Sequence, residues 1–355
     1  MRQIEVTMMN FRTSHPLQPF WNLAAAPLQS QALDLALQHH LFALLETPKG
    51  AADVTRQLDL TPPGAVVWLD LLWSMGLLER HVPAAKGTAE TRYSASPRAA
   101  RFFVETSGDN CAQAWQYRCH FLTRVSTQLE ALLKKGGAPD QGAAAGVAAP
   151  KGTWAQAARE QIGQEQRAVT VPAVRRLFAA LPPLPERGRF LDLGAGAGHI
   201  GLALAQQLPG WRGVLCDQAE TAEVAQENIR AAGLSDRVEA LGCDVNCDSI
   251  GSGYDLIWCS SVLHFLSAPQ AAVRKLFEAL NPGGMLLLAH AELADDAELA
   301  ARVLPFYAPM ILRGHYLPAS GELAQWMADA GFRDIRALGR ADFPMAPVWL
   351  HLGYR

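Results

Sequence analysis

The sequence contains no long hydrophobic segment and little charge of either sign. No apolar run reaches about 18 residues without a charge, so we expect no membrane-spanning helix. Residues 1–16 lack a basic flank followed by an apolar run, which predicts no signal peptide and a cytoplasmic protein. Charged residues make up 18% of the chain and the net charge is −3, so no basic field favours nucleic acid or an acidic membrane as a partner.

Cysteine is sparse, and its spacing does not indicate a metal site. The six cysteines include no C-x-x-C pair, and Cys243 and Cys247 have no second pair of ligands nearby. Because structural zinc sites combine such pairs, we expect no metal. Free thiols in a reducing compartment are the simplest expectation.

The length of 355 residues, half of them apolar, exceeds one ordinary core and predicts two domains. Apolar residues at three- to four-residue spacing predict helices over 28–46, 51–60 and 61–80, the last capped by Thr61. A polar stretch and the segment 91–97 then predict a two-stranded wing. Helix, turn, helix and wing together indicate a winged-helix module.

The second helix of such a module is typically the one that binds DNA. Here the segment 62–76 contains Trp68, Trp73 and many aliphatic residues but no Arg or Lys. A helix that must neutralise phosphates requires positive charge. We therefore expect this helix to be buried against a partner or against the rest of the chain.

The middle of the chain predicts helices separated by a loop. Residues 102–135 are helical and aromatic in character, 134–152 is rich in Gly, Ala and Pro, and 153–185 predicts one or two helices ended by prolines. The predicted domains are a winged-helix-like domain at 1–105, a helical linker region at 106–187 and a final domain at 188–355.

From residue 188 onward, short apolar runs alternate with amphipathic segments. The predicted strands are 189–194, 213–217, 237–244, 254–260 and 285–290, and the predicted helices are 199–208, 219–233, 269–280 and 321–331. Strands that are apolar throughout are typical of burial on both faces, so this alternation predicts an α/β fold with a parallel, doubly wound sheet. The segments 332–340 and 348–355 predict a closing hairpin pair.

The segment 190–201, FLDLGAGAGHIG, joins the first predicted strand to its helix. Its glycines fit both a G-x-G-x-G pattern behind an acidic residue and the dinucleotide fingerprint G-x-G-x-x-G. The first pattern uses Gly194, Gly196 and Gly198, and the second ends at Gly201. In both, glycine turns the chain tightly and lets a ligand approach bare backbone, so the spacing alone leaves the ligand open.

Asp192 favours the first pattern. A dinucleotide would place its pyrophosphate over this loop, and two unit charges about 4 Å apart repel by roughly 4 kcal/mol at an effective dielectric constant of about 20. S-adenosylmethionine carries no phosphate, and its cationic groups would be attracted instead. The alternative is that Asp192 only caps the turn that follows it. Asp217, which ends the second strand, suits the ribose hydroxyls of either ligand.

Further motifs follow in a fixed order along the chain. They are CD at 216–217, GCD at 242–244, VLH at 262–264, NPGG at 281–284 as a turn before the fifth strand, and AGF at 330–332. With these motifs, residues 188–340 resemble a class I S-adenosylmethionine-dependent methyltransferase. Nearly the whole chain is similar to the small-molecule O-methyltransferases of plant phenylpropanoid and bacterial antibiotic pathways.

This resemblance implies the architecture and the ligands. It implies a C-terminal Rossmann-like methyltransferase sheet, an N-terminal winged-helix-like dimerisation domain, a homodimer, and S-adenosylmethionine as the cofactor. Asp244 would accept a hydrogen bond from the adenine amino group. The implied cofactor-binding residues are Asp192, Gly194, Gly196, Asp217, Gln218, Asp244, Val245 and Ser260.

The resemblance also implies a catalytic base. In similar O-methyltransferases a histidine just past the fourth strand removes the hydroxyl proton, and His264 falls at that position. Phe265 departs from the family, which usually carries an acidic residue there. His264 therefore either keeps the role of base with a partner from elsewhere, His290 or Glu292, or is structural. His290 takes the position of the family's second carboxylate, and a two-histidine metal site lacks an assured acidic ligand.

The acceptor is expected to be flat and apolar. Expected substrate-binding residues, each of which also fits an ordinary core, are Trp115, His120, Phe121, Phe306, Tyr307 and Met310. The predicted reaction is methyl transfer to a hydroxyl of an aromatic or polyketide-like metabolite. The alternatives are transfer to carbon or nitrogen without a base, a relative with the cofactor but other chemistry, and a winged-helix regulator.

Overall fold

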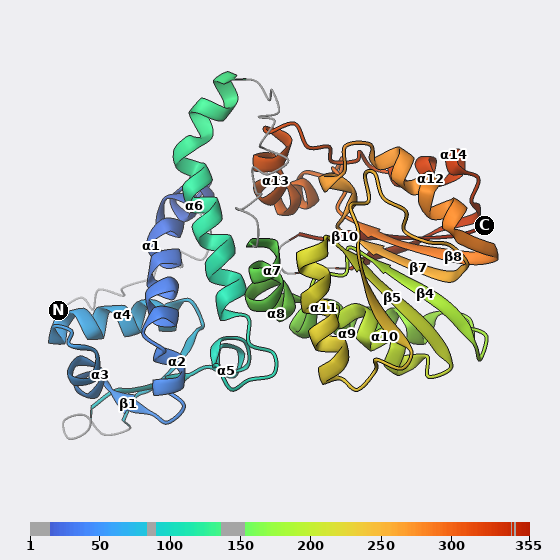
Figure 1. The fold of residues 1–355 in the computed structure, drawn as a ribbon. Helices are drawn as coiled ribbons and strands as arrows, with labels where there is room; N and C mark the ends of the chain where they lie inside the picture. Colours follow the sequence, from blue (N-terminus) through green and yellow to red (C-terminus); the bar gives the residue numbers. More distant parts are fainter. Residues whose placement is uncertain (1–14, 84–89, 136–152, 342, 344–345) are drawn as a thin grey trace, which may run out of the picture. The chain divides into compact units, whose positions relative to one another are not determined.

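The computed structural model describes residues 15–83, 90–135, 153–341, 343 and 346–355 (Figure 1). The chain forms two compact units, one ending at Ala112 and the other beginning at Gln113. The first boundary lies close to the predicted one at residue 105. The segment 106–187, predicted as a region of its own, belongs mostly to the second unit. The predicted 134–152 loop lies outside the described residues from 136 onward.

The first unit contains helices in the predicted segments and a wing, but the helix predicted over 61–80 ends at Ser74, and residues from Leu78 onward form the first strand of the wing. Its elements are α1 (Gln18–Gln38), α2 (Leu41–Leu44), β1 (Lys49–Gly50), α3 (Ala51–Leu58), α4 (Pro62–Ser74), β2 (Leu78–His81), β3 (Arg92–Ala95) and α5 (Pro97–Phe103). The antiparallel pair β2–β3 forms the wing, and the hydroxyl of Thr61 accepts a hydrogen bond from Gly64 N at 3.2 Å, which confirms the predicted cap. The helix predicted over 28–46 is instead broken at His40, whose φ of 50° cannot continue a right-handed helix.

The second unit begins with helices that lead into its sheet. They are α6 (Ala112–Lys135), α7 (Thr153–Ala157), α8 (Gly163–Glu165) and α9 (Val171–Ala180), and the π-helical segments η1 (Ala158–Ile162) and η2 (Gln166–Thr170) flank α8. The one or two helices predicted at 153–185 are therefore a single run with two wider π turns. Such turns are often found near functional sites.

The predicted doubly wound sheet is confirmed. Its strands, β4 (Gly188–Leu193), β5 (Trp211–Asp217), β6 (Val238–Gly242), β7 (Tyr254–Ser260), β8 (Leu280–His290), β9 (Arg333–Ala341) and β10 (Val348–Tyr354), lie in the order β6-β5-β4-β7-β8-β10-β9. The first five are parallel, and β10 pairs antiparallel with β8 and β9 as the predicted closing hairpin. The NPGG segment belongs to β8 rather than to a turn before it.

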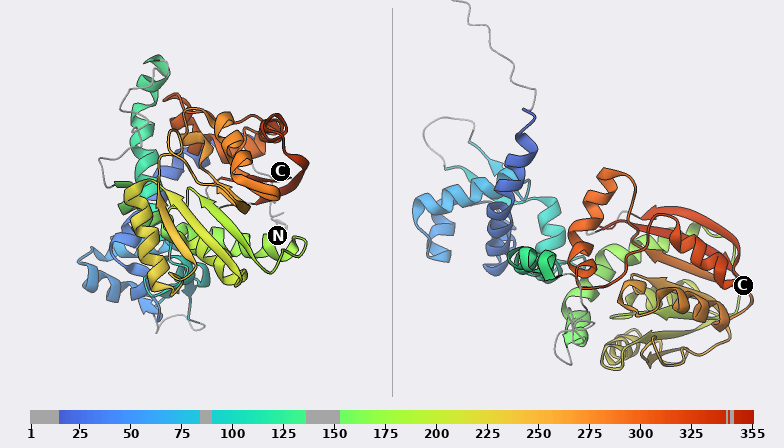
Figure 2. Two further views of the ribbon diagram at one scale, coloured as in Figure 1. Left: turned by 45° about the vertical axis from the view of Figure 1, so that its right-hand side comes forward. Right: turned by 90° about the horizontal axis from the view of Figure 1, so that it is seen from above.

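Helices cover both faces of this sheet (Figures 1 and 2). On one face α9 packs with α10 (His199–Gln207) and α11 (Ala219–Ala231), and on the other lie α12 (Pro269–Ala279) and α14 (Glu322–Ala330). Successive residues of β4 alternate between the two cores: Phe190 joins one and Leu191 the other. The order in which strands are added changes direction between β4 and β7: β5 and β6 lie on one side of β4, and β7 and β8 lie on the other. Ligands of such sheets bind at the carboxyl ends of the strands at this switch point.

A disulfide joins Cys216 and Cys243, so the expectation of free thiols is wrong for this pair. Cys216 lies in β5, Cys243 follows β6, and the two strands are hydrogen-bonded neighbours, which places the two Cα atoms 6.6 Å apart. The sequence could not reveal this, because the pairing depends on the register of the strands. The other four cysteines carry thiols. No helix among the described residues is both long and apolar enough to cross a membrane.

Candidate active site

The glycine loop joins β4 to α10 at the switch point of the sheet. Gly194, Gly196 and Gly198 have φ values of 71°, 57° and 82°, a conformation that strains any residue with a Cβ. At Gly194 a Cβ would also overlap Val262. The N–H groups of Gly194 and Ala195 donate to the carbonyl of Cys216 at 2.8 and 3.0 Å, which fixes the loop to the end of β5.

Asp192 lies beneath this loop. Its side chain is 1% exposed, and its Oδ2 accepts a hydrogen bond from Gly201 N at 2.8 Å in the first turn of α10. Burial raises the pKa of Asp192 to about 7. The carboxyl group therefore takes the alternative predicted role of a cap, and near neutral pH it carries only part of the charge that the electrostatic argument assigned to it.

Two further carboxylates follow β5 and β6. Asp217 accepts hydrogen bonds from Gly196 N and Gln218 N, each at 2.8 Å, and burial raises its pKa. Asp244 is exposed, and its Oδ1 accepts from the backbone and side chain of Asn246 at 2.9 Å. These bonds lower the pKa of Asp244 and keep it ionised.

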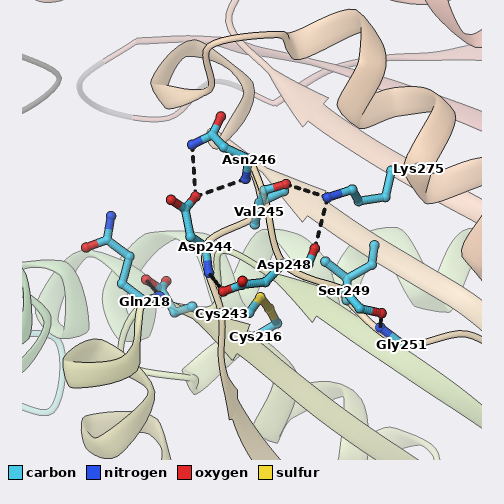
Figure 3. Close-up of a disulfide and its surroundings, with 12 residues drawn as sticks. Cys216, Gln218, Cys243, Asp244, Val245, Asn246, Asp248, Ser249, Gly251 and Lys275 are labelled. Atoms are coloured by element: carbon cyan, nitrogen blue, oxygen red, sulfur yellow. Dashed lines mark hydrogen bonds between the residues drawn. A yellow bond between two sulfur atoms is a disulfide. The ribbon is translucent and has the colours of Figure 1, made fainter.

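The turn that carries Asp244 is held from two sides (Figure 3). Lys275, from α12, donates to the carbonyls of Val245 and Asp248 at 2.7 and 2.9 Å. On the other side, the Cys216–Cys243 disulfide ties the start of the turn to β5. The carboxylate of Asp244 is therefore presented from a rigid position.

This arrangement fits S-adenosylmethionine. The predicted cofactor contacts lie at the carboxyl ends of four neighbouring strands. Asp244 follows β6, Asp217 ends β5, the glycine loop follows β4, and half-buried Ser260 ends β7. Asp217 and Asp244 offer acceptors for hydroxyl and amino donors, as ribose and adenine require, and the glycine loop offers bare backbone. Gln218, the exposed residue at the start of α11, and half-buried Val245 lie beside these two carboxylates in the chain.

Three consecutive polar residues that the sequence analysis missed hold this site together. Gln164 accepts from Ala114 N at 3.1 Å, Glu165 forms a bidentate ion pair with Arg118 at 3.0 and 3.2 Å, and Gln166 donates to Ala195 O at 2.8 Å. They therefore connect α6 to the glycine loop. In the sequence these residues form the polar run QEQ at 164–166, within the segment 153–185 that was predicted to be helical.

A pair of buried histidines lies at the carboxyl ends of β7 and β8. His264, in the turn η3 (Leu263–Phe265), is 5% exposed, and His290, the last residue of β8, is 0% exposed. His290 Nδ1 lies 2.7 Å from the carbonyl of Ala291, and its Nε2 lies 3.0 Å from His264 Nδ1.

These two contacts fix both tautomers. A carbonyl can only accept, so His290 carries its proton on Nδ1 and accepts at Nε2. His264 then donates from Nδ1, which leaves the lone pair of His264 on Nε2. Burial lowers the pKa of His264 well below its usual value and that of His290 to about 4, so both rings are neutral near pH 7.

Glu292, the other predicted partner of His264, is engaged elsewhere. One carboxylate oxygen accepts from His351 Nε2 and the other from Gly321 N, at 2.8 and 2.9 Å. The carboxylate is 1% exposed. Of the two partners that the sequence left open, His290 is the one that hydrogen-bonds to His264. Glu292 forms a buried pair with His351 instead.

Aromatic side chains surround His264. The ring of Phe265 lies 4.0 Å and that of Tyr307 5.2 Å from it between centroids, and Trp154 packs edge-on against Phe265. His315 Nδ1 donates to the carbonyl of His264 at 3.0 Å. Trp154 and His315 were not among the predicted site residues, because neither lies in a recognisable motif.

The predicted substrate residues fall into two groups. Tyr307 lies against His264, and Phe306 and Met310 pack in the same cluster on α13 (Ala297–Ile311). Those on α6 are Trp115 and Phe121, both half-buried, and His120, which is exposed. Arg118, a residue of α6 that was not among the predicted ones, affects the pKa of both His264 and Tyr307.

Two family models match the chain. One describes a methyltransferase domain and matches residues 191–286, and the other describes an O-methyltransferase dimerisation domain and matches residues 21–105. The chain is a methyltransferase. The methyltransferase model covers the strands β4 to β8 around the glycine loop, and the cofactor of this enzyme is therefore S-adenosylmethionine.

Relatives of this methyltransferase extend over most of its length. The tetracenomycin polyketide synthesis 8-O-methyl transferase TcmO of Streptomyces glaucescens is 29% identical over 316 residues, 86% of this chain and 88% of that protein. The N,N-dimethyltransferase OxyT of Streptomyces rimosus is 29% identical over 353 residues, 93% and 96% of the two chains. Human N-acetylserotonin methyltransferase, solved with S-adenosylmethionine, has the same fold with a TM-score of 0.71, 17% identity and coverage of 98% and 99%.

Proposed function

We propose that this methyltransferase transfers a methyl group to a hydroxyl of an aromatic or polyketide-like small molecule, with His264 as the general base. The observation that carries the proposal is the hydrogen-bonded pair of histidines, which leaves the Nε2 lone pair of His264 available. Tyr307 and Phe265 beside that ring supply flat apolar surfaces suited to an aromatic acceptor. The printed activity of TcmO, an O-methyl transfer in polyketide synthesis, agrees with this acceptor class.

In this reaction the chain removes one proton and aligns two reactants. When bound, S-adenosylmethionine would supply an activated methyl group, and its sulfur would keep the electron pair of the broken carbon–sulfur bond. His264 Nε2 takes the hydroxyl proton as the oxygen attacks the methyl carbon, and the proton later passes to solvent. Asp217, Asp244 and the glycine loop would hold the cofactor, and Asp192 would act through the loop that it caps.

Replacement of His264 tests the role of the base. His264→Gln keeps a side-chain amide that can donate to His290 but has no basic nitrogen, and His264→Ala removes both functions. We expect both variants to lose at least about 100-fold in kcat for transfer to a hydroxyl, the usual range for a general base. Both should bind S-adenosylmethionine with an unchanged Kd in calorimetry.

The same experiment separates the alternatives. Full activity of His264→Gln would show that no base is needed, and transfer to carbon or nitrogen would replace the proposal. The likeness to OxyT makes an amine the specific alternative acceptor. Mass spectrometry of the labelled product after treatment with a demethylating acid distinguishes an O-methyl from an N-methyl group.

We also propose that the first unit forms a homodimer. The dimerisation-domain model spans residues 21–105, which begin within α1. Large apolar side chains of α1 are 65% to 71% exposed: Phe20, Trp21, Leu23 and Leu28. Several large apolar side chains exposed on one helix are typical of a protein–protein interface.

A further inference from the structure

An open cavity of about 410 Å³ lies in the helical layer that covers one face of the sheet. Its walls are η2 and α9 on one side and α11 on the other, with α10 between them (Figure 1). None of the predicted cofactor or acceptor contacts is among its lining residues. Those that carry the argument are Arg167, Arg175, His199, Leu202, Ala203 and Gln206.

The floor of this cavity is apolar and belongs to α10. Leu202 is 7% exposed and Ala203 1% exposed. His199 and Gln206 lie on the same face of the helix, since positions three, four and seven residues apart share one face. The cavity therefore extends along α10 from its first turn to its last, with an apolar middle and a polar side chain at each end.

Two exposed arginines reach from the η2–α9 wall to the two ends of α10. Arg167 Nη1 lies 3.0 Å from His199 Nε2, and Arg175 Nη2 donates to Gln206 Oε1 at 3.1 Å. A guanidinium group can only donate, so His199 accepts at Nε2. Burial and the nearby Arg167 lower the pKa of His199 to about 4, so its ring is neutral near pH 7. The two contacts are about two helical turns apart, roughly 11 Å along α10.

Neither arginine has an anionic partner. The lining of the cavity contains no Asp or Glu, and no carboxylate of the described residues forms an ion pair with Arg167 or Arg175. Arg118 and Arg159, by contrast, are each paired with a glutamate. Two uncompensated positive charges at the ends of an apolar floor favour a ligand with an anionic group at each end of an apolar body.

The walls of the cavity also hold the glycine loop of the cofactor site. Gln166, in η2, donates to Ala195 O at 2.8 Å and accepts from His199 N at 3.3 Å. From the α11 wall, Asn228 donates to Ala197 O at 2.8 Å. A ligand that spans the two arginines would hold η2 and α9 against α10, and it would thereby stabilise these contacts to the loop.

We infer that this cavity is a second ligand site, which binds an elongated organic dicarboxylate and thereby strengthens cofactor binding. The carboxylates contact Arg167 and Arg175, and the apolar chain lies over Leu202 and Ala203. One guanidinium at each end matches the single charge of a carboxylate, whereas a phosphate monoester carries nearly two. This inference goes beyond the proposed function, because it does not depend on which atom receives the methyl group.

Calorimetry on the full-length protein at low salt tests the site with sebacate, succinate and decanoate. Sebacate carries its two carboxylates at the ends of a long methylene chain and succinate at the ends of a short one, and decanoate has the length of sebacate with one carboxylate. We expect sebacate to bind once per chain and at least about threefold more tightly than either of the others. A smaller difference, or no binding of sebacate, would overturn the inference.

Arginine variants show whether sebacate binds in this cavity. Arg167→Gln and Arg175→Gln each remove one charge and keep a side-chain amide. Arg176→Gln changes an exposed residue of α9 outside the lining and is the matched control. We expect each of the first two variants to weaken sebacate binding at least about threefold, and Arg176→Gln to leave it unchanged. Equal weakening in all three would mean that sebacate responds only to the general charge of the surface, and the inference would be wrong.

The affinity for S-adenosylhomocysteine gives a second readout that needs no turnover. With saturating sebacate we expect its Kd to fall at least about twofold, and S-adenosylhomocysteine should strengthen sebacate binding by the same factor. An unchanged Kd in both directions would overturn the action on the cofactor site. Competition between the two would show that sebacate occupies the cofactor site, and it would overturn the whole inference. Neither measurement uses a methyl acceptor, so failure of the proposed function would leave these results unaffected.

Discussion

A single backbone carbonyl determines which nitrogen of His264 is basic. Ala291 O accepts from His290 Nδ1, and this bond sets the tautomers of both rings. The sequence indicated that His264 and His290 could meet past adjacent strands, but it left Glu292 equally available as a partner. Only the distances separate the two, because His290 lies within hydrogen-bonding distance of His264, whereas Glu292 is bonded to His351 on β10.

Asp192 gives a prediction for the pH dependence of stability. Its pKa is about 7 in the folded protein and about 3.9 in an unfolded chain. Between these values the folded state holds a proton that the unfolded state has lost, so this group's contribution to the free energy of unfolding falls as pH rises from about 4 to 7. Asp192→Asn should remove that fall, which amounts to about 1.4 kcal/mol for each pH unit.

Urea denaturation of both proteins at pH 5 and pH 7 measures this difference. The asparagine retains an oxygen for Gly201 N, so the cap is preserved as a control. Equal pH dependence in the two proteins would contradict a raised pKa at this position.

At the scale of elements, the site depends on connections between segments far apart in the chain. Gln164, Glu165 and Gln166 hold α6 and the glycine loop through one short helical stretch. The Cys216–Cys243 disulfide and Lys275 hold the turn with Asp244. Local sequence predicts the helices and strands themselves, because their hydrophobic periodicity is local, but not which side chains bridge them.

The disulfide gives a prediction at this scale. After denaturation without reductant, a maleimide should label four thiols, and after reduction six, counted by intact mass. Because the bridge closes a loop of 27 residues, its reduction should lower the free energy of unfolding by about 3 kcal/mol. Cys216→Ser with Cys243→Ser should show the same loss and no further response to reductant. Six thiols labelled before reduction would exclude the bridge.

At the scale of the whole molecule, the first unit exposes large apolar side chains, and the second unit contains the proposed methyl-transfer site. The exposed apolar residues of α1 and the absence of Arg and Lys from α4 fit an association surface better than a DNA-binding one. The proposed homodimer follows from the first unit alone.

Light scattering at micromolar concentration should therefore give about twice the chain mass of 38.4 kDa. The double variant Trp21→Glu with Leu23→Glu places charge on the apolar surface of α1 and should shift the protein toward the monomer. Gln29→Glu, on an exposed polar position of the same helix, is the matched control and should remain dimeric. A monomeric wild type would contradict the proposal.

The sequence by itself determined the order of helices and strands, the glycine loop after β4, and the position of His264 after β7, because each follows from a local pattern or from chain order. Tertiary structure alone decided that Asp192 is a buried cap, that His290 rather than Glu292 partners His264, that Cys216 and Cys243 are bonded, and that Arg118 of α6 acts on Tyr307. These outcomes depend on strand register and burial, which bring together residues that no local pattern relates.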